Sequence, residues 1–406
     1  MAFQITRNRA LSPRGSSAFE DVVSLTGAQA ARSEISAWPG YAVTPLHDLV
    51  PVASACGVDH VFYKDEASRF GLGSFKALGG AYAVARLLQR QVQDRLGRPV
   101  AIAELARGDH LRITQSLTVV SATDGNHGRS VAAGAAWFGC RCVILVHEDV
   151  SEGRKQAIEL LGAHVIRLAG DYDDTVREAA RLSSRDGWSL VADTSGAGDE
   201  AACVDIMHGY TVMVAEAFEQ LSQSRRAPPT HIFVQGGVGG LAAAVCAHAG
   251  QVFGDQAPIH VVVEPDRADC LFQSAMAGAP TKATGDLKTI MAGLACGEVS
   301  ELAWRVLERG AEFFMTIPDQ AALDAMRLLA DKARAGTAIV AGESAGAGLA
   351  GLLLVSADPG AKAELRLDRQ SRVLLFGTEG ATDRALYTKL MAGLAGPAGG
   401  APHQAV

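Results

Sequence analysis

One lysine in this sequence has a spacing from glycines and apolar residues that could give it chemistry. Lys76 lies in Ser-Phe-Lys-Ala-Leu-Gly-Gly, at the start of a long apolar helical pattern. A helix N-terminus disfavours a cation, because the helix dipole places positive charge there. A desolvated lysine at that position has a lowered pKa, which suits bond formation with a carbonyl carbon. A lysine whose stem only covers apolar surface has the same spacing, so the pattern leaves both interpretations open.

A polar loop farther along the chain offers an anion site. Residues 123–128, Thr-Asp-Gly-Asn-His-Gly, follow an apolar strand pattern and open a helical one. Backbone N–H groups at the start of a helix bind anions. Asp124 or Asn126 alone would fit a helix cap, but a cap needs only one such residue. The loop therefore predicts an anion site with polar side chains beside it.

A glycine-rich loop follows the apolar segment His-Ile-Phe-Val-Gln. Residues 236–240 read Gly-Gly-Val-Gly-Gly and precede another apolar helical pattern. Glycines let backbone donors approach a phosphate closely. No Lys-Ser/Thr pair follows, so the loop is not that of a P-loop nucleotidase. Glu264 ends the next strand pattern at the distance of a ribose contact, but the proline after it and the mid-chain position of the loop argue against a dinucleotide site.

A lysine amine, an anion-binding loop and a phosphate-binding glycine loop together fit pyridoxal 5′-phosphate. The segments SFKALGG, DGNHG and QGGVGG, in this order, resemble the fold-type II pyridoxal-phosphate enzymes, the tryptophan synthase β-like group. Within that group the chain resembles the diaminopropionate ammonia-lyase family. The matching stretches run from about residue 69 to residue 383 and include TDGNHGR and IMAGLACGE, which are specific to that branch.

The resemblance implies a cofactor contact for each matching residue. Lys76 matches the lysine that forms the Schiff base, Phe75 matches the residue that packs on the cofactor ring, and Asn126 matches the asparagine that bonds the phenolic oxygen. Thr378 falls where a serine or threonine meets the pyridine nitrogen. The phosphate loop is matched by Gly236, Gly237, Val238, Gly239 and Gly240.

The resemblance also implies substrate contacts and a reaction. Asp124 and Asp193 match two aspartates implicated toward opposite enantiomers, and Thr123 and His127 lie in the loop that would hold the substrate carboxylate. The implied reaction is α,β-elimination of ammonia from 2,3-diaminopropionate, giving pyruvate and ammonia. An aspartate can pair with the second ammonium of such a substrate, and a positioned acid helps the β-amine to leave.

One segment departs from the family pattern. Residues 195–205, Ser-Gly-Ala-Gly-Asp-Glu-Ala-Ala-Cys-Val-Asp, replace a stretch that contains aromatic residues in the family. The change predicts a more open and more acidic pocket edge, which would suit an N-substituted diaminopropionate. A repacked surface loop explains the same segment, so the substrate and its enantiomer stay open.

Two further functions fit parts of the pattern. A serine/threonine-type dehydratase, or another β-eliminating lyase of the same fold, shares the lysine and glycine motifs. DGNHGR, however, replaces the serine-containing loop usual in those dehydratases. A cofactor-binding or amino-acid-sensing protein without turnover is a third candidate, and the presence of Lys76, Asp124 and Asp193 together argues against it.

The order of strand and helix patterns predicts the elements that position these residues. Short apolar runs alternate with helical patterns through the middle of the chain, which indicates βαβ units and a mostly parallel α/β fold. Sites in such sheets lie at the carboxyl ends of strands, where the glycine clusters fall. The resemblance implies a large domain of residues 1–80 and 189–406, a smaller inserted domain of residues 81–188, and pyridoxal phosphate in the cleft between them. We expect residues 1–40 to form a polar wrapping arm and residues 396–406 a disordered tail.

Composition excludes several classes of protein. The 406 residues are 48% hydrophobic with a net charge of −7, and no long basic run exists, so a large core is expected and a nucleic-acid partner is not. No apolar stretch has the length of a signal peptide or a membrane span, which predicts a soluble cytoplasmic protein. The family resemblance implies a homodimer.

The seven cysteines fit neither a disulfide scaffold nor a metal site. Their number is odd and they are spread over a long chain. Cys140 and Cys142 lack partners at zinc spacing, so no metal is expected. Cys270 and Cys296 lie in motifs of the lyase branch and could approach each other, but a cytosolic compartment favours thiols.

Overall fold

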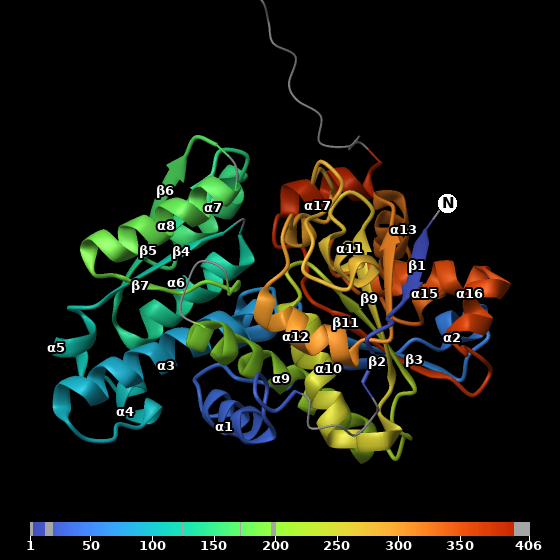
Figure 1. The fold of residues 1–406 in the computed structure, drawn as a ribbon, viewed down its shortest axis with the longest axis horizontal. Coiled ribbons are helices and arrows are strands. Elements are labelled where there is room, and N and C mark those ends of the chain that lie inside the picture. Colours follow the sequence, from blue (N-terminus) through green and yellow to red (C-terminus); the bar gives the residue numbers. More distant parts are fainter. Residues whose placement is uncertain (1–2, 13–18, 124, 171, 196–199, 394–406) are drawn as a thin grey trace, which may run out of the picture.

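Two β-sheets form the framework of the chain. The computed structural model describes residues 3–12, 19–123, 125–170, 172–195 and 200–393. The larger sheet has the strand order β1-β10-β9-β8-β11-β3-β2 (Figure 1). Its strands are β1 (Gln4–Arg7), β10 (Phe313–Ile317), β9 (Ile259–Pro265), β8 (His231–Gln235), β11 (Arg372–Gly377), β3 (His60–Asp65) and β2 (Leu46–Asp48). The five central strands are parallel, and β1 and β2 pair antiparallel at the two edges.

The smaller sheet is entirely parallel. Its order is β6-β5-β4-β7, with β6 (His164–Leu168), β5 (Arg141–His147), β4 (Thr118–Ala122) and β7 (Ser189–Leu190). The two sheets confirm the expected mostly parallel α/β fold. Because β7 pairs with β4, the smaller sheet extends two residues past the expected boundary at residue 188. The division into two domains stays a prediction.

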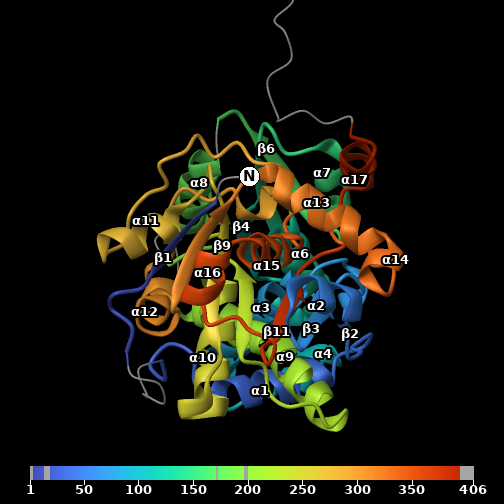
Figure 2. The same cartoon turned by 90° about the vertical axis from the view of Figure 1, so that its right-hand side faces the viewer.

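Helices cover both faces of the larger sheet because its strands are apolar on both sides. In β11, Val373 and Leu375 pack in the cluster that holds the outer helices, whereas Leu374 and Phe376 pack in the cluster that faces the smaller sheet. The outer helices are α2 (Val50–Cys56), α13 (Asp319–Ala330), α15 (Ala347–Ala357) and α16 (Pro359–Glu364), and they lie in front of the sheet in Figure 2. The inner ones include α1 (Leu25–Ser36), α9 (Glu200–Gln223), α10 (Gly240–Phe253) and α12 (Glu301–Gly310).

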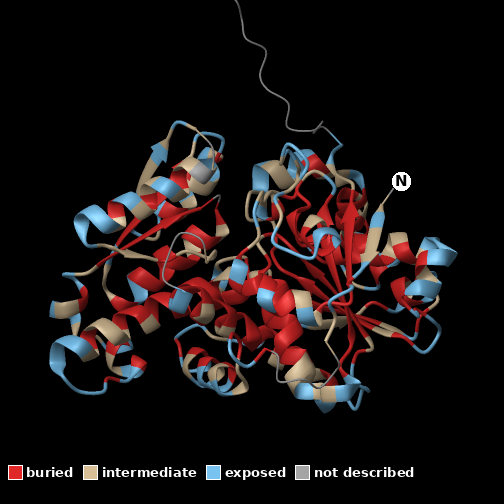
Figure 3. Cartoon of the chain, in the orientation of Figure 1, coloured by how far each residue is buried: buried red, intermediate tan, exposed pale blue. Residues whose placement is uncertain are grey.

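Helix α3 (Lys76–Leu96) joins the two sheets. It packs against α6 (Asn126–Phe138) of the smaller sheet and against α9 of the larger one. A Cβ built on Gly80 would lie 1.9 Å from Ser130 Oγ of α6, and one on Gly79 would lie 2.4 Å from Cε1 of Tyr210 of α9. Only glycine allows this approach, so α3 holds the two halves together at a continuous buried core, drawn red in Figure 3.

The other helices complete the layers. α8 (Tyr172–Asp186) covers the second face of the smaller sheet and buries Ala179 and Leu182 against Val120 and Val143. The remaining elements are α4 (Ile102–Ala106), α5 (Leu111–Thr114), α7 (Glu152–Glu159), α11 (Cys270–Ala277), α14 (Lys332–Ala335), α17 (Arg384–Met391), η1 (Arg69–Gly71), η2 (Gly254–Gln256) and η3 (Ala292–Leu294).

The expected polar arm at residues 1–40 is wrong in part. β1 forms an edge of the larger sheet, and α1 packs on α9 with Ala28, Ala31 and Ile35 buried. Their spacing of three and four residues places these side chains on one face of the helix. Ser24 caps α1 by accepting a hydrogen bond from the Gly27 N–H at 3.0 Å. The expected tail at residues 396–406 lies outside the described residues.

Candidate active site

Lys76 and Asp193 form the centre of the candidate site. Lys76 Nζ donates to Asp193 Oδ2 at 2.8 Å, and the two side chains are 22% and 14% exposed. Lys76 begins α3, and the loop before it is fixed because the Phe75 N–H donates to the Thr378 carbonyl at 3.0 Å. Burial on its own raises the pKa of Asp193, but the Lys76 ammonium and the His127 ring lower that pKa below its ordinary value. The site therefore holds an ionised aspartate beside the predicted reactive lysine.

Two aromatic residues lie beside this ion pair. His127 Nε2 lies 3.1 Å from the Val191 carbonyl, and its Nδ1 lies 3.9 Å from Asp193 Oδ2. Nδ1 is buried and has no hydrogen-bond partner among the described residues. The Tyr210 hydroxyl faces Lys76, and burial raises its pKa to about 12 although the Lys76 charge acts to lower it. The Tyr210 ring packs on Phe75 with 4.6 Å between ring centroids.

The polar loop before α6 is shaped by its own threonine. Thr123 Oγ1 accepts hydrogen bonds from the N–H groups of Gly125 and Gly128, each at 3.0 Å. The turn places Asn126 as the first residue of α6, where its amide Nδ2 donates to Glu379 Oε2. Asp124, the predicted catalytic residue of this loop, lies outside the described residues.

The glycine loop lies between β8 and the N-terminus of α10. Gly237 and Gly239 have φ of +67° and +99°, in the left-handed region that favours glycine. A Cβ built on Gly236 would lie 2.5 Å from Glu264 Cγ, whereas one on Gly240 would meet no atom within 4 Å. Open space at the first residue of a helix, behind two left-handed glycines, fits a phosphate group.

The edge of the site beyond β11 contains two buried residues in succession. Thr378 and Glu379 directly follow β11 and are each 4% exposed. Glu379 Oε1 accepts the Ser344 N–H at 3.3 Å, and Thr382 Oγ1 lies 3.4 Å from Oε2. Glu343 is a close neighbour, and burial together with the Glu379 carboxylate raises the pKa of Glu343 to about 7. Arg154 of α7 forms an ion pair with Glu343 at 2.9 Å.

Sequence reasoning did not assign a role to Glu379, Glu343 or Tyr210. Glu379 stands in the stretch GTEGATD and Tyr210 follows the divergent segment in IMHGY, and both stretches resemble the family. A polar residue within a matching stretch and directly after a strand is the signal that could have identified Glu379.

Glu264 does not have the geometry of a ribose ligand. Its carboxyl oxygens accept the N–H groups of Leu271 and Phe272, at 3.1 Å and 2.7 Å, and so cap α11. Burial raises the pKa of Glu264 to about 8. Cys270 Sγ lies 3.5 Å from the Gly237 carbonyl, and both Cys270 and Cys296 carry thiols.

The divergent segment is less acidic toward the site than expected. Asp205, one of its three acidic residues, is buried and pairs with Arg90 at 2.7 Å and with Arg86 at 3.5 Å, both on α3. Ser195 Oγ lies 3.1 Å from Ser300 Oγ, which ties the segment to the N-terminus of α12. Residues 196–199 lie outside the described residues. The expectation of an acidic pocket edge is therefore wrong for Asp205, because α3 neutralises that carboxylate.

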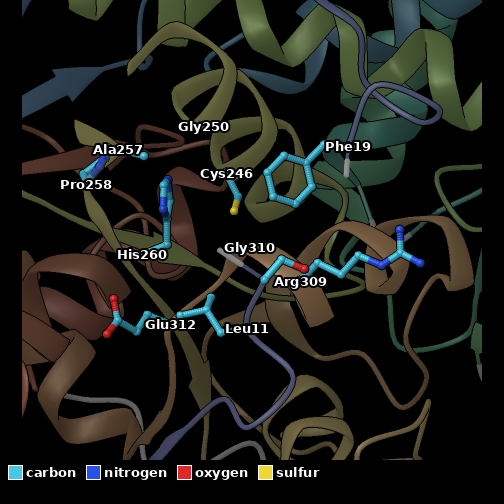
Figure 4. A pocket seen from close by; sticks show the side chains of 11 residues that line it. Leu11, Phe19, Cys246, Gly250, Ala257, Pro258, His260, Arg309, Gly310 and Glu312 are labelled. Atoms are coloured by element: carbon cyan, nitrogen blue, oxygen red, sulfur yellow. The ribbon is translucent and has the colours of Figure 1, made fainter. Parts of the chain in front are cut away.

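Two small cavities differ in their relation to the site. One cavity, of about 10 Å³, has Asp193 in its wall. Its other lining residues are Ala122, Tyr172, Val176, Ala179, Leu190, Ala192 and Thr194. The other, of about 30 Å³, lies near the amino ends of β9 and β10, where Phe19, Cys246 and His260 surround the same space (Figure 4). The residues of the candidate site follow the carboxyl ends of the strands, so the second cavity lies at the opposite ends of the strands from the site. No three His, Cys, Asp or Glu side chains of the described residues gather into a possible metal site.

Comparison with known proteins gives matches over most of the chain. Residues 37–375 match the family described as pyridoxal-phosphate dependent enzyme. The curated diaminopropionate ammonia-lyase of Escherichia coli (strain K12) is 37% identical over 357 residues, which cover 87% of this chain and 88% of the relative. That of Salmonella typhimurium (strain LT2) is 37% identical over 360 residues, 87% of this chain and 89% of the relative.

A solved structure gives the same match in three dimensions. The crystal structure of diaminopropionate ammonia lyase from Escherichia coli, in complex with an aminoacrylate-PLP azomethine reaction intermediate, aligns with a TM-score of 0.85 and 35% identity. The alignment covers 96% of this chain and 97% of that one.

Proposed function

The chain belongs to the diaminopropionate ammonia-lyase family of pyridoxal-phosphate dependent enzymes, and we propose from that premise that it uses pyridoxal 5′-phosphate to eliminate ammonia from 2,3-diaminopropionate. The elimination removes the Cα proton and the β-amine, and water converts the remaining enamine into pyruvate and a second ammonia. The observation that carries the proposal is the 2.8 Å contact between Lys76 and Asp193 at the start of α3. An amine and an ionised carboxylate meet there beside the two anion-binding loops.

The residues around Lys76 fit the cofactor. The open space at Gly240 and the left-handed glycines before it fit the phosphate of the cofactor. The amide of Asn126 lies in the polar loop at the start of α6. When bound, pyridoxal phosphate supplies an electrophilic carbon and a ring that withdraws electron density from the substrate Cα. We assign its contacts to Lys76, Phe75, Asn126, Thr378, Gly236, Gly237, Val238, Gly239 and Gly240.

Proton movement is assigned to the side chains around the ion pair. Asp193 is an ionised carboxylate in the structure, so it can pair with a substrate ammonium, and the ionised form is also the one that can accept a Cα proton. Lys76 Nζ can deliver the proton that a departing amine needs. Asp124 is proposed as the second base, for the opposite enantiomer, and Thr123 and His127 as contacts of the substrate carboxylate.

The remaining parts of the proposal concern assembly and location. We propose a large cofactor domain of residues 1–80 and 189–406, an inserted domain of residues 81–188, a homodimer and a cytoplasmic location. Among the described residues, no helix is long and apolar enough to cross a membrane. Light scattering during size-exclusion chromatography checks the dimer: twice the chain mass is expected, and a monomer at micromolar concentration contradicts it.

Purified protein with added pyridoxal phosphate tests the function. D- and L-2,3-diaminopropionate, an N-substituted analogue, D- and L-serine and L-threonine are offered separately, and pyruvate or other 2-oxo acid and ammonia are measured. The proposal predicts two ammonia per pyruvate from 2,3-diaminopropionate, with a higher kcat/KM than for the hydroxy amino acids. One ammonia per pyruvate from serine, with no turnover of the diamino acid, would identify a dehydratase instead.

The same panel of compounds distinguishes an altered substrate preference from a loss of catalysis. A preference for the N-substituted compound supports a site adapted by residues 195–205. Cofactor binding without turnover of any compound identifies a sensor and contradicts the enzyme proposal.

A further inference from the structure

Glu379 contacts two other parts of the candidate site. Its backbone pairs with Ser74, two residues before Lys76, in an isolated antiparallel bridge. The N–H of the next residue, Gly380, donates to the Gly73 carbonyl at 3.0 Å. Its side chain reaches the other way, to Asn126 at the start of α6. Glu379 therefore contacts both the lysine loop and the polar loop.

Both carboxylate oxygens of Glu379 are occupied by donors. Oε1 accepts from the Ser344 backbone, and Oε2 accepts from Asn126, with Thr382 Oγ1 nearby. The Gly342 backbone also lies close, because a Cβ built there would be 2.8 Å from Glu379 Cγ. Glu379 is 4% exposed, so the rotamer of its side chain is set by these neighbours rather than by solvent.

A carboxylate in this position decides which way the Asn126 amide faces. An asparagine amide has an acceptor end and a donor end, and an ionised carboxylate can only accept. Glu379 therefore holds the NH₂ group of Asn126 toward the site edge. One N–H binds Glu379, and the second N–H of the same group stays available for an acceptor on a ligand.

We propose that Glu379 is a positioning residue that fixes the Asn126 amide with its NH₂ group toward the phenolic oxygen of the bound cofactor. This inference rests on the proposed function, which places the cofactor against Asn126. Without Glu379 the amide can rotate and turn its oxygen toward the phenolic oxygen of the cofactor, so that two hydrogen-bond acceptors would face each other. The residue acts through Asn126 and needs no contact with the cofactor itself.

A double-mutant cycle on cofactor affinity tests the inference. Pyridoxal phosphate is titrated into apo forms of the wild type, Glu379→Ala, Asn126→Ala and the double variant, and the Kd is measured from the visible absorption. We expect Glu379→Ala to raise Kd about tenfold, the effect of losing one charge-assisted hydrogen bond. In the Asn126→Ala background the same substitution should leave Kd within about twofold, since the two residues act as one unit.

Two further measurements separate positioning from a general loss of structure. Glu379→Gln keeps one acceptor oxygen where the wild type has two, so its Kd is expected between those of the wild type and Glu379→Ala. The visible absorption maximum of the bound cofactor should shift in Glu379→Ala in the same direction as in Asn126→Ala. A structural role alone would lower the melting temperature without this spectral change.

Glu312→Ala is the matched control. Glu312 is 5% exposed, close to the value for Glu379, and pairs with Arg366 at 2.9 Å. It directly precedes β10 and so lies at the amino ends of the strands, away from the candidate site. Its loss should lower stability and leave Kd and the spectrum unchanged. Equal effects of Glu379→Ala in both Asn126 backgrounds, or an unchanged Kd and spectrum, would overturn the inference. A wild-type protein that binds no pyridoxal phosphate would instead contradict the proposed function.

Discussion

Two groups of ionisable side chains near α3 differ in how completely they are paired. The first, the β3–α9 charge cluster, consists of Lys64, Glu66, Arg69 and Glu216, all with 0% side-chain exposure. Lys64 Nζ donates to Glu216, to the Thr44 carbonyl and to Gln220, at 2.6, 2.8 and 2.9 Å. Arg69 donates to Glu66 and Glu216 from all three of its nitrogens.

The second group, the Lys76 cluster, consists of Lys76, Asp193 and His127. Its ion pair is partly exposed, and His127 Nδ1 has no hydrogen-bond partner among the described residues. In the β3–α9 charge cluster, burial raises the pKa of Glu216, but Arg69 and Lys64 lower it to about 2, so the carboxylate stays charged and held. A cluster with every polar atom paired has nothing left for a ligand. The Lys76 cluster keeps the capacity to bind a ligand, and this difference distinguishes a reactive site from a structural one.

Replacing Lys76 should produce the largest change in activity. We expect Lys76→Ala to lower kcat/KM for 2,3-diaminopropionate by at least about 10³-fold, because the amine nucleophile is lost. The free energy of unfolding should change less than in Glu216→Ala, since the Lys76–Asp193 pair is partly exposed whereas the partners of Glu216 are fully buried. Pyruvate release and urea denaturation measure the two effects. Retained activity in Lys76→Ala would show that Lys76 takes no part in the reaction.

Asp193→Asn is expected to be next in size. The amide keeps the shape of the side chain but cannot accept a proton, so kcat should fall by about 10²–10⁴-fold for one enantiomer. The other enantiomer should lose less if Asp124 serves it. Separate assays of D- and L-2,3-diaminopropionate check this difference, and equal small losses for both would contradict the assignment.

Glu216→Ala tests the opposite side of the comparison. Lys64 and Arg69 would stay buried without their shared carboxylate, which should lower the free energy of unfolding by about 3–5 kcal/mol. Chemical denaturation measures the loss. An effect below about 1 kcal/mol, as for a surface pair, would show that the β3–α9 charge cluster is not the structural one.

The last expected effect is a pH dependence from Glu264, which for each single pH unit is smaller than the loss expected for Glu216→Ala. Its pKa of about 8 in the folded chain lies above its ordinary value of 4.5, so the folded state binds more protons between these pH values. Stability should therefore fall as pH rises from about 5 to 8, by up to about 1 kcal/mol per pH unit, and level off above 8. Glu264→Gln should flatten this slope in denaturation curves at pH 5, 6, 7 and 8. Parallel curves for the variant and the wild type would contradict the role of Glu264.

The sequence predicted the features of the molecule that local patterns determine. The segment His-Ile-Phe-Val-Gln forms β8, and the two loops follow β4 and β8 as expected. Lys76, Asn126 and the glycines could be identified because each stands in a short motif at a strand end or helix start. These are also the residues on which the family resemblance depends.

Contacts between distant residues were not predictable in the same way. Glu379 meets Asn126 across 253 residues, and the β3–α9 charge cluster joins residue 69 to residue 216. Neither contact leaves a spacing pattern, because each depends on how two layers pack. The first 40 residues were misjudged for a related reason: α1 buries only a narrow apolar face, so its composition is that of a polar segment.

Locating the cofactor on the chain tests directly whether Lys76 is the reactive lysine. Pyridoxal phosphate is added to the wild-type protein, borohydride reduces any link to a lysine into a stable secondary amine, and peptide mass spectrometry finds the label. One pyridoxyl group per chain is expected on Lys76, and none on the buried Lys64. A label on another lysine, or no label in a protein that still releases pyruvate, would contradict it.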